Sequence, residues 1–415
     1  MIRVSANLDH HRITALILAF VSIFISDTIK GLTFTSILYL GSIFIIHLYQ
    51  NGFKIKYNYL SIIVVLNLFF LTLVIRGACS LNYKFVLKDF ILKLPLLLIP
   101  IFTMYKGFLS KEKLNYVINF FLIIVLISAT IDLLGSLIDN ILFNHAGSFF
   151  YKDLTHLMTN QAFYKSWIYL TSFFLIERKI YNNSYKKNKA WYFYLTLIIL
   201  SILLLLSRIF IIIMIVTYTI ILINRFLENQ RIRPLATFFS FTLFSLLIIF
   251  SNKYSKNRFK DLAVEAKSFL IQKNQRSTNP RAYIWNIGAS IIKSNFILGL
   301  GVDMADNVLK SRLKSNQVKL WNGSEMELIY KRNFNYHNQF MQSFAELGFI
   351  GFSLILYLVI YPLFKVQPND IAFIFLSISF FGFLTESVFE RQVGVLYFSI
   401  MYSIFINLQK EINLQ

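Results

Sequence analysis

The sequence predicts an all-α polytopic membrane protein with about twelve transmembrane helices and one large external loop that contains amphipathic helices. Of the 415 residues, 56% are hydrophobic, and the mean hydropathy is +0.60. Apolar runs of about 20 residues, the length of a bilayer-crossing helix, recur from one end of the chain to the other. The single cysteine, Cys79, excludes an internal disulfide framework and a cysteine-based metal cluster.

Each apolar run is interpreted as one span. The first is expected to be retained, because no small-residue cleavage site follows it. The seventh and eighth runs are separated only by LSRIF around Arg208, so one long kinked helix is the alternative there. The expected spans are 13–29, 32–48, 59–75, 90–105, 114–138, 161–176, 191–207, 208–223, 234–251, 343–364, 371–385 and 393–408.

The spans divide the chain into three stretches of one integrated domain. Residues 1–251 hold helices one to nine, 252–342 form the large loop, and 343–415 hold helices ten to twelve. With a cytoplasmic N-terminus, 17 basic residues fall in cytoplasmic segments and nine in short outer loops or spans. This bias predicts that both termini are cytoplasmic and that the large loop is external.

The net charge of +21 has two sources. Nucleic-acid binding is excluded by the membrane spans, and about half of the excess is explained by cytoplasmic loops facing anionic membrane lipids. The large loop carries the other 15 of the 41 basic residues against six acidic ones. Such a surface suits an anionic partner, a lipid phosphate or an acidic glycan; a merely solvated loop is the alternative.

The loop segment NPRAYIWNIGASIIKSN predicts an amphipathic helix. Asn279 suits the N-cap and Pro280 the first helical position. Its isoleucines recur at helical spacing beside Trp285, which predicts a helix lying along the outer membrane surface. Arg281 falls in the first turn, where the helix dipole favours an anion, so a bound phosphate would explain a cation there. The alternative is an arginine reaching toward lipid headgroups.

The stretch YHNQFMQSFAELGFIGF places polar residues where the loop re-enters the membrane. On a helix, Asn338, Gln342 and Glu346 form one polar stripe, with His337 at its outer end. We expect Glu346 to orient His337 indirectly or to pair with an arginine. The glycines that follow, beginning with Gly348, permit close approach of a neighbouring helix.

Four separated segments deliver polar or charged groups to the same predicted membrane face. They contribute Arg208, Arg281, His337, and, from TESVFERQVG after the eleventh span, Glu386, Glu390 and Arg391. Ionisable groups at a membrane boundary mark candidate functional sites. This convergence predicts a site on the outer face.

The same segments carry a family resemblance. An SR pair opens a span, followed in order by RAYIWNIGASIIKSNFILGLG, HNQFMQSFAELGFIG and LTESVFERQVGV. This order resembles the O-antigen ligase and polymerase superfamily of bacterial envelope glycosyltransferases, over about residues 190–400. One departure is Asn295-Phe296, where the family often has Asn-Pro; residues 1–190 match only in hydropathy.

The resemblance implies a ligase in the bacterial inner membrane with a periplasmic loop and active face. It implies transfer of a glycan from undecaprenyl diphosphate to an acceptor hydroxyl on lipid A-core. By this similarity Arg208 and Arg281 hold the diphosphate, and His337 acts as general base near the acceptor. No cofactor or metal is expected, because no ligand-spaced cluster occurs. The expected substrate-binding residues are Asn338, Gln342, Glu346, Glu390, Arg391 and Trp285.

Other activities remain alternatives. A polymerase would join lipid-linked repeats and differs only in its acceptor, and a protein O-oligosaccharyltransferase of similar layout is a third option. A lipid-linked oligosaccharide flippase would need charged residues in its central spans, where Asp132 is nearly the only carboxylate. Transport also gives no reason for a ninety-residue outer loop.

Overall fold

The structure is a computed structural model, and each regular element in its described part is a helix. The described residues are 2–25, 30–52, 60–78, 83–105, 107–144, 146–156, 161–181, 190–229, 256, 280–315, 335–366 and 370–408. The predicted ninth span, 234–251, lies outside them.

The long helices alternate with shorter ones along the chain. The α-helices are α1 (Ile2–Ile25), α2 (Lys30–Asn51), α3 (Leu60–Ala78), α4 (Tyr83–Lys93), α5 (Pro95–Thr103), α6 (Lys111–Phe143), α7 (Ala162–Tyr181), α8 (Ala190–Leu204), α9 (Arg208–Asn229), α12 (Pro280–Ser294), α13 (Val302–Ser315), α15 (Gln339–Lys365), α16 (Ile371–Phe383) and α17 (Gln392–Leu408). Short 3₁₀ helices are η2 (Ala146–Phe149), η3 (Asp153–Thr155) and η4 (Val388–Glu390).

Five of the described helices are long and apolar enough to cross a bilayer: α1, α2, α3, α6 and α15. Four shorter apolar helices, α8, α9, α16 and α17, coincide with further predicted spans. The all-helical class with apolar spans is therefore confirmed, whereas the count of twelve and the periplasmic placement of the loop stay predictions.

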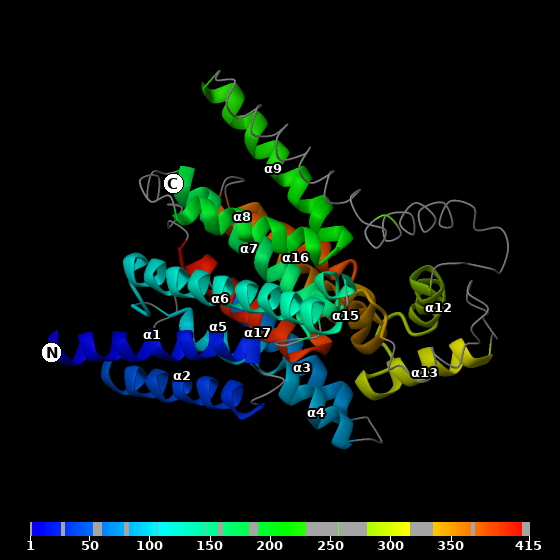
Figure 1. Cartoon of the computed structure of the whole chain (residues 1–415). Helices are drawn as coiled ribbons and strands as arrows, with labels where there is room; N and C mark the ends of the chain where they lie inside the picture. Colours follow the sequence, from blue (N-terminus) through cyan, green and yellow to red (C-terminus); the bar gives the residue numbers. More distant parts are fainter. Residues whose placement is uncertain are drawn as a thin grey trace.

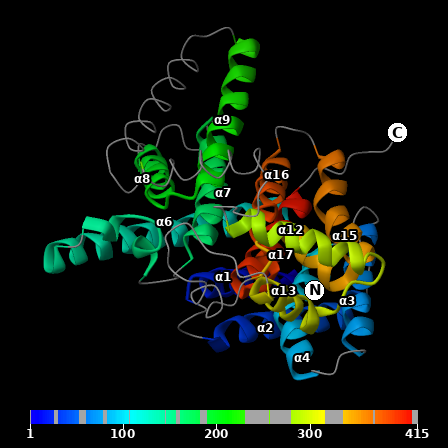
Figure 2. The same cartoon turned by 90° about the vertical axis from the view of Figure 1, so that its right-hand side faces the viewer.

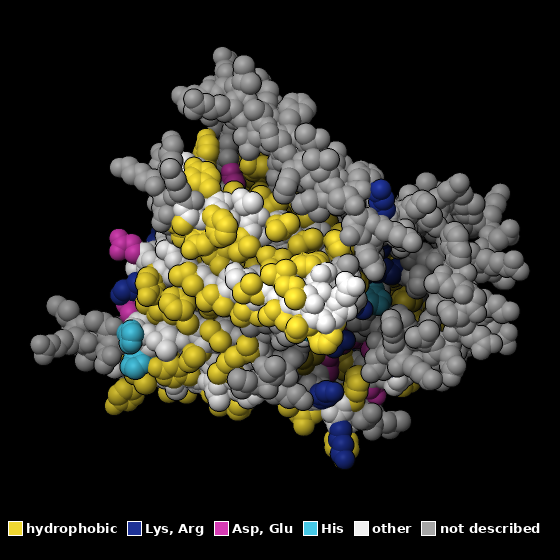
Figure 3. Space-filling view, viewed as in Figure 1, with side chains coloured by type: hydrophobic (Ala, Val, Ile, Leu, Met, Phe, Trp, Pro, Cys, Tyr) yellow, Lys and Arg dark blue, Asp and Glu magenta, His cyan; other side chains and the backbone are white. Residues whose placement is uncertain are grey.

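The helices form a bundle with α12 and α13 at the end opposite the N-terminus (Figure 1). Figure 2 looks onto that end and shows α12 and α13 in front of α15, which both of them contact. Hydrophobic side chains cover the middle of the face in Figure 3, and most described charged side chains lie toward its two ends. This distribution suits a bundle whose middle lies in hydrocarbon. We call the end with α12 and α13 the loop end.

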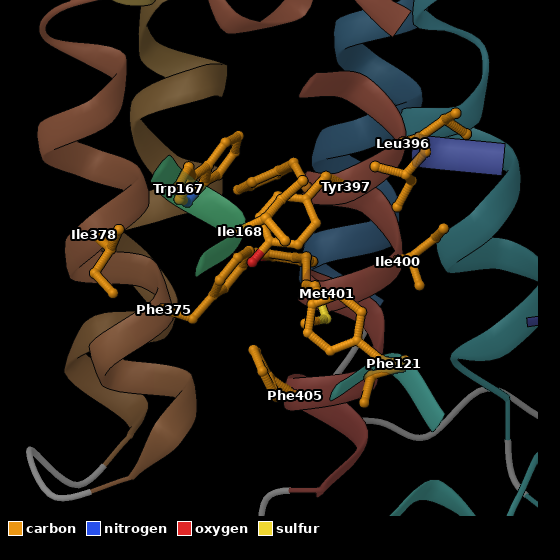
Figure 4. Close-up of a cluster of buried hydrophobic side chains, with 14 of the residues drawn as sticks. Phe121, Trp167, Ile168, Phe375, Ile378, Leu396, Tyr397, Ile400, Met401 and Phe405 are labelled. Carbon is orange, nitrogen blue, oxygen red and sulfur yellow. The ribbon is translucent and has the colours of Figure 1, made fainter. Parts of the chain in front are cut away.

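An aromatic core joins α7, α16 and α17 (Figure 4). The Trp167 ring stacks on Phe375 at an interplanar angle of 6°, with ring centroids 6.2 Å apart. It also meets Tyr397 edge-on at 4.9 Å. Offset and edge-on aromatic pairs add stability beyond the apolar area that they bury. This core holds α16, and therefore the turn that follows it, in place.

The predicted span 90–105 is wrong as a single helix. The structure divides this stretch into the end of α4 at Lys93 and the nine-residue α5, which begins at Pro95. Proline lacks a backbone N–H, so Pro95 cannot continue the intrahelical hydrogen bonds, which gives the boundary a local cause even though Leu94 keeps a helical φ of −54° and ψ of −35°.

Residues 191–223 form two helices rather than one kinked helix. Helix α8 ends at Leu204, and Leu206 has a φ of 49°, in the left-handed region that interrupts a helix. Arg208 is then the first residue of α9.

Helix α15 is broken at Gly348, where φ is 66° and ψ is −161°. The segment from Phe296 to Gly301 docks against this break through backbone hydrogen bonds. Phe349 N donates to Phe296 O at 2.8 Å, and Leu300 N donates to Ala345 O at 2.7 Å. The neighbour that Gly348 admits is therefore this irregular segment and not the helix that the sequence suggested. These bonds partner backbone groups that the helix break leaves without an intrahelical partner.

Gly348→Ala is expected to destabilise the fold. An added Cβ would lie 2.1 Å from Ile297 O, and alanine at positive φ is strained by about 1–3 kcal/mol before that clash is counted. The melting temperature in detergent should therefore fall. Gly31→Ala is the matched control, because its Cβ would meet nothing within 4 Å. Equal melting temperatures for the two variants would contradict the docking described above.

Helix α12 has the predicted extent, but its apolar face is covered by protein. Ile284, Ile287 and Ile291 are buried in a small core with Leu309 and Leu313 of α13. The apolar face of α12 thus packs on protein and does not face lipid, whereas the position of α12 relative to the membrane stays a prediction. The apolar partner is supplied by α13, an amphipathic helix that sequence reasoning left unassigned.

Candidate functional site

His337 occupies a strained position at the start of α15. Its φ is 47°, and its backbone N–H donates to Asn335 Oδ1 at 3.0 Å. The preceding carbonyl, of Tyr336, accepts a hydrogen bond from the indole of Trp285 at 2.9 Å. Residues held in the left-handed region cost free energy and cluster at functional sites, so the local geometry favours a role for His337. Trp285 supports this segment through the backbone.

The ring of His337 faces the carboxylate of Glu386, on the turn after α16. Its Nδ1 lies 3.0 Å from Oε1 and 3.1 Å from Oε2. The side chains are 26% and 18% exposed, so the pair is partly open. When Nδ1 carries the hydrogen that it donates to the carboxylate, Nε2 is the nitrogen that can accept a proton. The pair therefore has the geometry of a base held by an acidic partner.

Burial opposes ionisation of Glu386, but the hydrogen bond and charge of His337, with a smaller effect of Arg281, outweigh it and lower the pKa of this carboxyl. Arg281 Nη2 lies 3.9 Å from Glu386 Oε2, and the arginine side chain is 40% exposed. The structure thus brings two of the predicted catalytic residues, His337 and Arg281, to one carboxylate that the sequence had placed only in the general cluster.

Arg208 is part-buried at the first position of α9. Two residues later, Phe210 packs toward Gly382 of α16, where an added Cβ would meet its ring at 3.5 Å. The start of α9 therefore lies beside the end of α16, which leads directly into the turn with Glu386. Arg208 therefore begins a helix that lies beside this turn, and its place in the predicted cluster stays a prediction.

The predicted polar stripe exists, but protein groups cover it. Asn338, Gln342 and Glu346 are all buried. Asn338 Oδ1 caps α15 by accepting from Met341 N at 3.0 Å, and Asn338 Nδ2 donates to Leu384 O at 3.2 Å. Gln342 Nε2 donates to Glu346 Oε1 at 2.5 Å. In this conformation the three side chains stabilise the site from within, and their predicted contact with substrate stays a prediction.

Sequence reasoning missed the partner of Glu346, which is Lys93. The ammonium of Lys93 lies 3.2 Å from Glu346 Oε2, and also contacts Asp89 and Glu390. The expectation that Glu346 pairs with an arginine is therefore wrong, and Glu386 takes the orienting role proposed for Glu346. The available signal was Lys93 itself, since a lysine inside an apolar stretch requires an anionic partner.

Glu390 and Arg391 lie on a different side of the turn from the His337–Glu386 pair. They line a cleft of about 520 Å³ together with Phe34 and Ile37 of α2 and Lys88 of α4. Arg391 is exposed there. These two predicted substrate-binding residues are thus close to Glu386 in the sequence but face α2 and α4.

Within the described residues, no group of three or more His, Cys, Asp or Glu side chains is arranged to hold a metal ion.

Fold and site together define a multi-pass helical membrane protein with a histidine–glutamate pair and an arginine at one end of its bundle. Residues 193–356 match the family described as O-antigen ligase, which confirms the similarity to that superfamily over this part of the chain. The match includes Arg208, Arg281 and His337 and ends before Glu386. It supports a membrane glycosyltransferase-like enzyme of the O-antigen ligase or polymerase type. Comparison with curated proteins gave no match.

The two glutamates of the turn should give opposite pH dependences of stability. The lowered pKa of Glu386 contributes stability that is present above its ordinary value of 4.5 and lost as pH falls through the folded-state value. Burial raises the pKa of Glu390 to about 7, although Lys93 opposes this, so its contribution is present below about 4.5 and is lost as pH rises through about 7.

Melting temperatures in detergent between pH 4 and 8 should therefore separate two variants. Glu386→Gln should lower the melting temperature at pH 7, with a difference that shrinks toward pH 4. Glu390→Gln should raise it at pH 8 and change it little at pH 4. Parallel curves for the two variants would show that these carboxyls do not titrate as described.

Proposed function

We propose that this protein transfers a glycan from undecaprenyl diphosphate to a hydroxyl of lipid A-core, as an O-antigen ligase. The observation that carries the proposal is the His337–Glu386 pair at 3.0 Å with Arg281 3.9 Å from the same carboxylate. It combines a base for a hydroxyl with a cation for a diphosphate. The family match over residues 193–356 supports the same class of reaction.

In the proposed reaction, His337 Nε2 accepts the proton of the acceptor hydroxyl while that oxygen attacks the anomeric carbon of the glycan. The bond between this carbon and the diphosphate oxygen breaks, and its electron pair leaves with undecaprenyl diphosphate. Glu386 keeps Nδ1 protonated and stabilises the imidazolium that forms. The proton is then released to solvent.

The leaving diphosphate gains negative charge as the bond breaks. Guanidinium groups can hold phosphate oxygens by two parallel hydrogen bonds and offset this charge. Arg281 is partly exposed beside the pair and suits this role. Arg208, at the start of α9, is proposed as the second cation, because α9 begins beside the end of α16.

We further propose that the protein lies in the bacterial inner membrane with the loop end in the periplasm. Thiol labelling of Lys314→Cys and Lys187→Cys in a Cys79→Ser background tests this orientation. A membrane-impermeant maleimide should label position 314 in intact cells and position 187 only after lysis. Labelling of position 187 from outside intact cells would overturn the periplasmic placement of the site.

The acceptor decides between a ligase and a polymerase, and a gene deletion read on a lipopolysaccharide gel distinguishes them. Loss of all polymer from the core is the result expected for a ligase. A core that carries a single repeat would instead identify a polymerase, and an unchanged ladder would exclude both functions.

A further inference from the structure

Lys93 joins three elements of the loop end inside the protein. Its side chain is 1% exposed and comes from the last residue of α4. Its Nζ donates to Asp89 at 2.9 Å and to Glu346 of α15 at 3.2 Å, and lies 3.0 Å from Glu390 of η4. One ammonium thus contacts a carboxylate from each of three separate elements.

The cluster has one cation for three carboxylates, so the lysine is its essential member. Glu346 is 3% exposed, and Asp89 is 7% exposed. Buried carboxylates are stable only when a cation or hydrogen-bond donors compensate them. Without the Lys93 charge these buried carboxyls would take up protons or turn to other partners, so the ionic contact that joins the three elements would be lost.

Glu346 and Glu390 are both connected to the His337–Glu386 pair through a few intervening residues. Glu346 accepts from Gln342, whose Oε1 accepts a hydrogen bond from Tyr336 N at 3.2 Å, directly before His337. Glu390 ends the 3₁₀ turn that starts two residues after Glu386. Lys93 therefore ties both the histidine segment and the Glu386 turn to α4.

The two elements also contact each other beside the pair. Phe389 N donates to Gln339 Oε1 at 2.7 Å, and Asn338 N donates to Ser387 Oγ at 3.3 Å. A relative movement of η4 and α15 would therefore strain these bonds and separate His337 from Glu386.

We propose that Lys93 is a positioning residue that sets the distance between His337 and Glu386 by anchoring α15 and η4 to α4. For the reaction this inference rests on the proposed function, since Lys93 touches no reacting atom in it. The claim that Lys93 sets how closely α15 and η4 approach each other does not depend on the proposed function.

Lys165 provides a matched control. It is also 1% exposed and forms a buried pair with Asp132 at 2.6 Å, between α7 and α6. Its partner Asp132 belongs to α6, not to α15 or η4. Removing the Lys165 charge should destabilise the fold about as much as removing the Lys93 charge. The His337–Glu386 distance should not change, because Lys165 does not anchor α15 or η4.

The first test measures glycan transfer by purified variants. Lys93→Met should lower kcat by about 10–100-fold with little change in KM for the lipid-diphosphate donor, because small misplacements of catalytic groups have effects of this size. Adding Glu346→Gln should restore part of the rate by removing one uncompensated carboxylate. Lys165→Met should keep kcat near wild type. A wild-type kcat for Lys93→Met would overturn the proposal.

The second test requires no activity. His337→Cys and Glu386→Cys are combined in a Cys79→Ser background, and the rate of disulfide formation reports how closely the two segments approach. Lys93→Met should slow this rate measurably, because a disulfide forms only within a narrow range of distance and orientation between the two residues, and Lys165→Met should not. An unchanged rate with Lys93→Met overturns the positioning role, even if the protein transfers no glycan.

If Lys93→Met does not fold, Lys93→Met/Glu346→Gln carries the same cross-linking test. This variant leaves fewer uncompensated charges, and slow cross-linking is again the expected result. A third outcome separates the two proposals. If the cysteine pair cross-links quickly with Lys93 intact and slowly with Lys93→Met, but the wild-type protein transfers no glycan, the proposed function fails and the positioning role stands.

Discussion

Arg281→Ala is expected to abolish glycan transfer while leaving protein abundance near wild type. The guanidinium is 40% exposed beside Glu386, so it can reach a diphosphate without moving the bundle. Removing one preorganised group that stabilises developing charge typically costs about 10²–10³ in kcat. Arg281 also lies in the first turn of α12, where backbone N–H groups add to the attraction for phosphate. Turnover of purified protein with a lipid-diphosphate donor measures the effect.

Arg281→Lys should recover only part of this rate, because an ammonium cannot reproduce the planar two-pronged contact with phosphate. Arg312→Ala is the control at the same end of the molecule. Arg312 lies on α13, and its Nη1 donates to Ser290 Oγ at 2.8 Å on an exposed surface. We expect it to retain wild-type turnover. A fully active Arg281→Ala protein would reduce α12 to a structural element.

Local signals predicted the parts of the fold that depend on neighbouring residues. Helix α12 begins at Pro280, where the proline predicted a start, and α15 begins directly after Asn338, where the polar stripe predicted a helix. The break before Arg208 was visible as a short polar interruption. Apolar length identified the membrane helices, because bilayer thickness imposes it on each span separately.

Contacts between distant residues could not be predicted in this way. His337 and Glu386 are 49 residues apart, and Lys93 and Glu346 are 253 apart. A single sequence shows that charged groups share a membrane face but not which side chains meet. For the same reason Glu346 was expected to serve His337, whereas helix packing gives that role to Glu386. The packing of α13 against the apolar face of α12 is likewise a tertiary contact that a single sequence does not show.

His337→Ala is expected to lower turnover by about 10²–10⁴-fold, the usual contribution of general-base catalysis, with donor binding largely kept. The ring is 26% exposed and held by Glu386, so it is both accessible and oriented. Wild-type turnover should fall at low pH, because a protonated imidazole cannot accept the hydroxyl proton. Glu386→Gln should also lower turnover, since the amide no longer stabilises the imidazolium.

The competing role for His337 is to bind acceptor sugar or to support the helix start, and His337→Gln separates the two. Glutamine can hydrogen-bond a sugar but cannot take a proton, so the general-base role predicts a rate close to that of His337→Ala. The measurement is turnover of wild type and His337→Gln between pH 5.5 and 8.5 with a purified lipid-diphosphate donor. Asn335→Ala tests whether the backbone conformation of His337 matters. Asn335 Oδ1 accepts a hydrogen bond from the backbone N–H of His337, so this substitution loosens the segment without removing the imidazole. Asn335→Ala should lower the rate while keeping the wild-type pH profile. A His337→Gln protein with a near-normal rate and an unchanged pH profile would end the general-base role and leave His337 as a binding residue.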